Sequence, residues 1–182
     1  YTQPEGNLKV FLRNYRLSDD IGFRFSSREW PEWPLTADKY ASWLSQAEGD
    51  TINLFMDYET FGEHQWEDTG IFSFLSHLPT EALKHQNLNF KTPSELLKKT
   101  KPVGTYDVPF LSSWADINRD LGAWLENSMQ QHAFSEIKNL EHFVINNPQL
   151  LDAWRKLQTS DHFYYMCTKW FADGDVHKYF NC

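Results

Sequence analysis

The densest group of reactive side chains in the sequence lies in the segment LFMDYETFGEH, residues 54–64. An apolar run ends there in three acids and a histidine, Asp57, Glu59, Glu63 and His64. The apolar run is typical of a strand, and alternation along a strand would place Asp57 and Glu59 on one face. Paired carboxyl groups where a strand gives way to a loop suit two kinds of chemistry, metal binding and cleavage of a glycosidic bond.

In the metal interpretation, Asp57, Glu59 and His64 supply oxygen and nitrogen ligands from one strand end and its loop. His162 in SDHFYY could join them from elsewhere in the chain. The sequence has no HExxH or CxxC motif and no second histidine cluster to complete the set. The metal interpretation therefore lacks a full ligand pattern.

In the glycosidic interpretation, one carboxyl group protonates the leaving oxygen and another acts as nucleophile or base. Aromatic faces stack on the apolar faces of sugar rings, and four tryptophans have loop-type surroundings: Trp30, Trp33, Trp66 and Trp114. A simpler alternative stays open for each single residue, because carboxylates often form ordinary ion pairs and tryptophans are often core residues.

The elements that would position this segment alternate between strand and helix. LKVFLRNY, residues 8–15, predicts a strand, followed by a helix with Ser18 as its N-cap. PLTADKYASWLSQ predicts a second helix capped by Thr36, and TINLFMDY, residues 51–58, predicts the next strand. IFSFLSHL then reads as a further helix from its apolar spacing.

A helix start is predicted in TPSELLKK, where Thr92, Pro93 and Glu95 form the pattern of a capping box. Strands and helices that alternate with short connections favour a parallel sheet with its site at the carboxyl ends of the strands. The expected fold class is therefore α/β, a portion of a (β/α)7-type barrel with parallel strands. Asp57 would lie at one such strand end.

From residue 114 onward the character of the sequence changes. RDLGAWLENSMQQHAFSEIKNLEHF and PQLLDAWRKLQ predict amphipathic helices with apolar residues on one stripe. No repeat, low-complexity tract or linker separates this part from the rest. We therefore expect one unit over residues 1–182, with barrel segments in 1–113 and a mainly helical region in 114–182.

Composition excludes several function classes. The 182 residues carry a formal net charge of -8 and scattered basic residues, which argues against nucleic-acid binding. No stretch is apolar enough to cross a membrane. Cys167 and Cys182 are too few for a disulfide scaffold, so a reducing, cytoplasmic setting is expected. The chain opens at Tyr1 without methionine and reads as a piece of a longer protein.

LFMDYETFGEHQW resembles the acid/base region of glycoside hydrolase family 57, in its alpha-amylase branch. Three further stretches are similar to the same family: LRNYRLSDDIGFRFS, SSWADINRDLGAWLEN and SDHFYYMCTKWFADGDVHKYF. The resemblance implies a (β/α)7 barrel followed by a helical bundle, and no cofactor. It also implies retaining cleavage or transfer of alpha-1,4-glucans through a covalent glycosyl-enzyme.

Carried over by residue, the resemblance places the family's acid/base aspartate on Asp57, two residues before the glutamate of the ExFG element. Glu59 would be a supporting carboxylate that orients the site and sets its charge, and Trp66 would line the sugar channel. The family's nucleophile glutamate and its HQP motif lie upstream of this region and have no match here. Retaining chemistry needs carboxyl groups about 5–5.5 Å apart, which is awkward for Glu59 or Glu63 as a substitute nucleophile. This chain alone is expected to be inactive.

Arg13 is expected at the end of the strand that precedes Asp57 in the sheet, on the same rim. There it could contact the carboxylates or a sugar hydroxyl. An ion pair with Asp19 or Asp20 is an equally good interpretation.

Four other residues complete the set of substrate-binding candidates. His64 lies in the acidic segment itself, and Trp114 could be a sugar platform or a core residue. Asp161 and His162 begin the last family-like stretch, which in the resemblance reaches back towards the site. Asp161 has a plainer interpretation as a helix cap.

Two alternative functions stay open at this point. One is a metal-dependent sugar hydrolase or deacetylase, and the other is a non-catalytic carbohydrate-binding piece. The partner expected in each case is an alpha-glucan or another oligosaccharide. An incomplete barrel would expose strand edges, so association into a homo-oligomer is also expected.

Overall fold

The computed structural model describes residues 1–6, 8–113, 115 and 118–169. By contacts the chain divides into two compact units, unit 1 over Tyr1–Asp107 and unit 2 from Val108 onward. The boundary lies close to the change of character expected at residue 114. The expectation that both parts belong to one catalytic domain stays a prediction.

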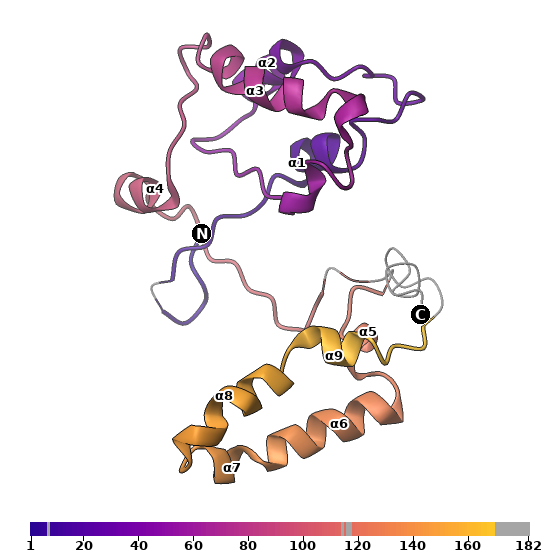
Figure 1. Ribbon diagram of the computed structural model, residues 1–182. Helices are drawn as coiled ribbons and strands as arrows, with labels where there is room; N and C mark the ends of the chain where they lie inside the picture. The colour runs from indigo at the N-terminus through magenta and orange to yellow at the C-terminus, as the bar shows by residue number, and fades with distance from the viewer. Residues whose placement is uncertain (7, 114, 116–117, 170–182) are drawn as a thin grey trace. The chain divides into compact units, whose positions relative to one another are not determined.

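Unit 1 is built from helices joined by irregular segments (Figure 1). In chain order they are α1 (Tyr15–Gly22), α2 (Ala37–Gln46), the 3-10 turns η1 (Tyr58–Thr60) and η2 (Glu67–Thr69), α3 (Ile71–Ala82) and α4 (Pro93–Lys99). Figure 1 shows α2 and α3 lying side by side, and these two helices make the most extensive helix contact in the described chain.

The core of unit 1 forms where α1, α2 and α3 bury their apolar faces together. Tyr40 of α2 is fully buried, and its ring meets Phe74 of α3 edge-on with 5.6 Å between centroids. Its hydroxyl donates to the carbonyl of Leu17 in α1 at 2.8 Å, so the polar tip of this buried ring is satisfied. Burial raises the pKa of Tyr40 well above its ordinary value. The phenol therefore remains a neutral donor that ties α2 to α1.

The barrel expectation for residues 1–113 is wrong for the described chain. In the described residues the structure has no strand; it has only isolated bridges, Thr2 with Lys9, Thr2 with Thr105 and Phe61 with Gln65. The fold is helix-rich and is not a portion of a parallel-strand barrel.

The physical reason is that a strand needs a ladder of backbone partners, whereas an apolar pattern reports burial only. Ile52, Leu54 and Met56 do pack against the core of unit 1. However, their segment bonds to the start of α1 and the residues before it. The Asn14 amide donates to the carbonyl of Asn53 at 2.9 Å, and no neighbouring strand continues the pairing in the described chain.

Two of the three helix caps expected from the sequence in unit 1 are confirmed, and one is wrong. The capping box of α4 is confirmed, because Thr92 and Glu95 exchange side-chain and backbone bonds. Thr36 is the N-cap residue of α2, as expected. Ser18 was the wrong cap for α1, since the helix begins at Tyr15 and the side chain of Asn14 accepts from the Leu17 amide at 3.1 Å.

Unit 2 is helical in its described part. Its helices are α5 (Gly122–Leu125), α6 (Ser128–Asn139), α7 (Glu141–Val144), α8 (Pro148–Leu157) and α9 (Ser160–Tyr164). Gln130 is fully buried, and its amide donates to the carbonyls of Ala123 and Phe163, which joins α5, α6 and α9. The Trp154 indole donates to the carbonyl of Ile137 at 2.8 Å and holds α8 to α6. None of the helices in the described residues is long and apolar enough to cross a membrane.

Candidate functional site

The acidic segment forms a tight turn that its own backbone closes. Asp57 stands at the N-cap of η1 with extended dihedrals, and its carbonyl accepts from the Thr60 amide at 3.2 Å. The carbonyl of Glu59 then accepts from two amides, those of Glu63 at 3.1 Å and His64 at 2.9 Å. We call residues 57–65 the carboxylate turn. Its backbone fixes where both carboxylates leave the main chain.

Gly62 makes this turn possible. Its φ of +113° lies in a region that residues with a side chain rarely adopt. A Cβ at this position would also come within 3.3 Å of the Phe72 ring. The close approach of the turn to α3 therefore requires glycine.

Two contacts hold the residues just before the turn against α1 and its entrance. The Phe55 amide donates to the hydroxyl of Ser18 at 3.2 Å, and the Arg13 guanidinium donates to the carbonyl of Phe55 at 2.7 Å. Arg13 also pairs with Asp19 at 2.5 Å. The ion pair expected for Arg13 is therefore present, and the same side chain supports the backbone two residues before Asp57.

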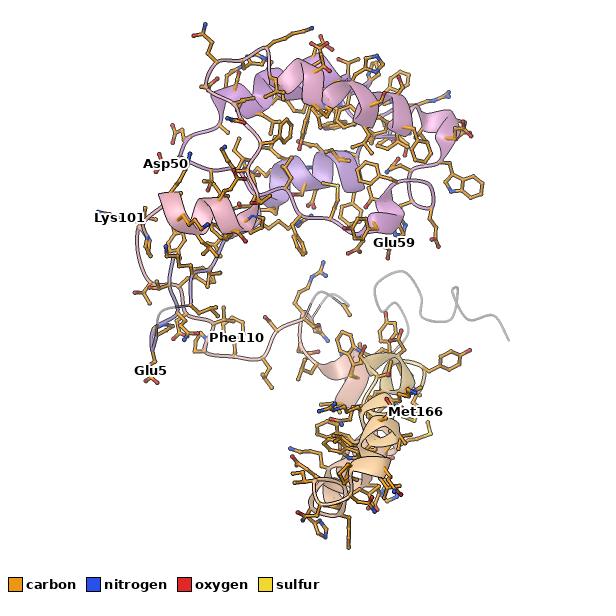
Figure 2. All side chains as sticks on the ribbon, turned by 60° about the vertical axis from the view of Figure 1, so that its left-hand side comes forward. Glu5, Asp50, Glu59, Lys101, Phe110 and Met166 are labelled. Atoms are coloured by element: carbon orange, nitrogen blue, oxygen red, sulfur yellow. The ribbon has the colours of Figure 1, made fainter. Side chains whose placement is uncertain are left out.

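The reactive side chains of the turn face solvent. Asp57, Glu59, Glu63 and His64 are all exposed. Figure 2 shows Glu59 at the edge of unit 1. A substrate can therefore reach these groups without any opening of unit 1.

An open hollow of about 570 Å³ lies beside the turn. We call it the Asp57 hollow, and Asp57 and Glu59 line part of it. Its apolar lining includes Ile21 of α1, Leu54 and Phe74. Carboxylates beside an apolar concave surface fit a ligand with both polar and apolar faces, as a sugar ring has.

The structure does not gather the proposed metal ligands. Among the described residues, no group of three or more histidine, cysteine, aspartate or glutamate side chains could hold a metal ion. This applies to Asp57, Glu59 and His64, although all three lie in the same turn. The arrangement suits proton transfer and hydrogen bonding by separate side chains.

The tryptophan candidates differ in their environments. Trp66 follows the turn at the N-cap of η2 and is 67% exposed, so its ring is available to a ligand. Trp30 packs against the core and meets Trp43 edge-on at 6.1 Å, which is a structural role. Trp33 is partly exposed beneath the Arg28 guanidinium at 5.8 Å. Trp114 lies outside the described residues.

Asp161 and His162 lie in α9 of unit 2, and both are exposed. The N-cap position of α9 is Thr159, so the cap interpretation of Asp161 is wrong by two residues. The carbonyl of Asp161 accepts from the Tyr165 amide at 2.8 Å within the helix. Arg13, Asp57, Glu59, His64 and Trp66 thus all belong to unit 1, whereas Asp161 and His162 belong to unit 2.

Sequence reasoning missed two residues that position the turn. Ser18 was read as a helix cap, and its hydroxyl instead receives the Phe55 amide from a distant segment. Gln65 carries no signal of its own in the sequence, although it is buried between exposed neighbours, His64 before it and Trp66 after it. No local pattern could have found either residue, because the partners of both are about forty positions away in the chain.

Comparison with known proteins gives two matches and one negative result. The family model described as "Glycosyl hydrolase family 57" matches residues 1–109, which is more than half of the chain. The chain is also 48% identical over 193 residues to a protein of Methanocaldococcus jannaschii named "Putative alpha-amylase". That match covers 100% of this chain and 41% of the relative, so the chain spans about two fifths of the relative's length. No solved structure matches the chain.

Proposed function

Because the chain belongs to glycosyl hydrolase family 57, we propose that it forms part of a catalytic domain that cleaves or transfers alpha-1,4-glucans with retention. The observation that carries the proposal is the position of the carboxylate turn. The family match over residues 1–109 includes the turn, and the turn presents two exposed carboxylates beside an open hollow. The name of the relative points to the same class of substrate.

In this proposal Asp57 is the general acid and base. Its carboxyl group gives a proton to the glycosidic oxygen as the bond breaks, and it then takes a proton from the water that releases the sugar. Glu59, two residues further along the same turn, supports the site and sets its charge. The exposure of both groups allows a polymer chain to approach them from solvent.

The nucleophile of a retaining mechanism is a second carboxylate on the other side of the scissile bond. The glutamate that fills this role in the family has no match in residues 1–182. We propose that polypeptide outside this sequence supplies it. On this account the chain binds glucan through its own residues and turns it over only together with that polypeptide.

Substrate contacts in the proposal come from the residues beside the turn. The exposed ring of Trp66 offers a flat apolar face on which a glucose unit can stack. The Asp57 hollow would hold a neighbouring unit against its apolar lining. His64 is exposed in the same turn and can hydrogen-bond to a sugar hydroxyl.

The test is an assay for reducing ends released from soluble starch, run on protein whose intact mass has been measured. In a preparation that also contains the nucleophile-bearing polypeptide, Asp57→Asn should lower the rate by about 10²–10⁴-fold, the usual range for a lost general acid. A preparation whose mass is that of this chain alone should leave starch untouched.

Asp50→Asn is the matched control. Asp50 is exposed, lies in unit 1 and precedes the same segment, so its substitution removes an equal charge without touching the turn. Its rate should equal that of the unaltered protein. Full starch cleavage by Asp57→Asn would refute the proposed role of Asp57, and cleavage by this chain alone would refute an external nucleophile.

A further inference from the structure

Gln65 is one of two buried residues of the carboxylate turn, the other being Thr60. It is 3% exposed, whereas Asp57, Glu59, Glu63 and His64 all face solvent. Its Nε2 donates to the carbonyl of Gly22, the last residue of α1, at 3.0 Å. Its Oε1 is buried and has no hydrogen-bond partner within the described chain.

The unpaired oxygen shows that core stability alone does not explain this side chain. A buried polar atom without a partner destabilises a fold, and an apolar side chain of similar size would avoid that cost. Gln65 does provide one thing that an apolar side chain cannot, a donor aimed at the end of α1. The function of the residue should therefore be sought in that bond.

The bond to Gly22 completes a pair of anchors on one helix. Before the turn, the Phe55 amide is held by the hydroxyl of Ser18, which is fully buried in α1. At the last residue of the turn, the Gln65 side chain is held by the carbonyl of Gly22, four positions further along the same helix. Both ends of the turn are therefore fixed to α1, one to the Ser18 side chain and the other to a carbonyl at the C-terminal end of the helix.

The turn between these anchors is stiff enough to transmit their position. The amide of Gln65 donates to the carbonyl of Thr60 at 3.0 Å, and its carbonyl accepts from the Gly62 amide at 2.9 Å. The backbone amide of Thr60 in turn donates to the carbonyl of Asp57. A shift of Gln65 would therefore move the backbone that carries both carboxylates.

We propose that Gln65 is a positioning residue, which fixes the place of Asp57 and Glu59 by tying the carboxylate turn to the end of α1. The inference rests on the proposed function, in which Asp57 must meet a glycosidic oxygen at hydrogen-bond distance. The 3.0 Å hydrogen bond from Gln65 to Gly22, at the opposite end of the turn from Asp57, supplies the needed restraint. Gln65 does not touch the reacting atoms.

The first test is Gln65→Met, which keeps the volume and removes both the donor and the unpaired oxygen. Amide hydrogen exchange of Gly62, His64 and residue 65 should become about two- to tenfold faster. This is the factor by which the loss of one hydrogen bond raises the equilibrium constant for local opening. The midpoint of global unfolding should stay unchanged or rise. Gln86→Met is the control, because Gln86 is an exposed glutamine of unit 1, and it should change neither quantity.

A second variant tests the donor itself. Gln65→Glu keeps an oxygen in place but cannot donate while it is ionised, so the turn should exchange quickly at neutral pH. Protonation at low pH restores a donor towards the Gly22 carbonyl, and the turn should then regain protection relative to Gln65→Met at the same pH. A residue that only filled space would show no such recovery.

The outcomes separate this inference from the proposed function. In a preparation that cleaves starch, Gln65→Met should lower kcat and leave KM nearly unchanged, since substrate contacts remain while the acid is less well placed. If Asp57→Asn leaves turnover intact, the proposed function fails, whatever the exchange data show. If turn exchange in Gln65→Met matches that of the unaltered protein, the positioning inference is overturned, whatever the turnover.

Discussion

At the scale of single residues, the site depends on backbone geometry as much as on its acids. Asp57 and Glu59 are ordinary exposed carboxylates until the turn fixes their directions. Gly62 permits the turn by its positive φ, and Gln65 ties the turn to α1. The chemistry proposed for Asp57 thus depends on neighbours that carry no charge.

Replacing Gly62 with alanine should destabilise unit 1. The alanine would need an unfavourable φ, at a cost of about 1–2 kcal/mol, and its Cβ would crowd the Phe72 ring. Urea unfolding followed by circular dichroism measures the loss. Gly22→Ala is the control, because nothing lies within 4 Å of a Cβ there; its free energy of unfolding should be unchanged or raised by up to about 1 kcal/mol. Equal stability of Gly62→Ala and Gly22→Ala would contradict this account of the turn.

At the scale of elements, helix starts that depend on neighbouring residues could be predicted from the sequence, whereas pairing with distant segments could not. The start of α4 was predicted because Thr92 and Glu95 are three residues apart and satisfy each other. The predicted strands are absent from the described residues, because a ladder depends on partners that a single segment does not show. The strand predicted for residues 51–58 is wrong for the described chain: Ile52, Leu54 and Met56 pack against the core of unit 1, but the hydrogen bonds of the segment go to α1 and the residues before it.

The capping box makes the start of α4 sensitive to pH. The Thr92 amide donates to the Glu95 carboxylate at 2.8 Å, and this bond lowers the pKa of Glu95 below its ordinary value. A carboxyl whose pKa is lower in the folded state stabilises that state above the unfolded pKa, and the contribution is lost as pH falls through the folded pKa. The helix start should therefore loosen only at a pH below the ordinary pKa of glutamate.

An NMR titration of the Thr92 amide checks this expectation. Its chemical shift should move with a midpoint below the ordinary glutamate pKa, and Glu95→Gln should abolish the transition, because the amide oxygen still accepts the bond but does not titrate. A midpoint above the ordinary value would show that the carboxylate is not held by Thr92 in solution.

At the scale of the whole molecule, family membership was predictable and architecture was not. The motif around Asp57 identified the family, and the match over residues 1–109 confirmed it. The barrel that the resemblance implied is absent from the described residues, in which unit 1 is a cluster of helices and irregular segments. A motif identifies a family from a few functional residues, whereas a sheet depends on pairing between distant segments. The family can therefore be identified from the sequence even where the fold cannot.

Exposed apolar side chains lead us to expect that the chain self-associates. The expected strand edges are not present in the described residues, but large apolar side chains are exposed, among them Phe55, Tyr58, Leu111, Phe143 and Ile145. Exposed apolar surface of this kind promotes association in water. Sedimentation velocity over a concentration series should show a rising mean sedimentation coefficient. The double substitution Phe143→Ser and Ile145→Ser should reduce the rise, and a constant coefficient at all concentrations would contradict the expectation.

The claim that Asp57 is the general acid is tested most directly by comparing leaving groups. In a preparation that cleaves glucan, Asp57→Asn should lose about 10²–10⁴-fold in rate on an alpha-1,4-glucan, whose leaving hydroxyl needs a proton. The comparison is made in kcat/KM, which reports cleavage of the glycosidic bond and not the later release of the sugar, in which Asp57 acts as base. By that measure the same variant should lose far less on a nitrophenyl maltooligosaccharide, whose leaving group departs without a proton. An equal loss on both substrates, or no loss on either, would contradict the assignment of Asp57.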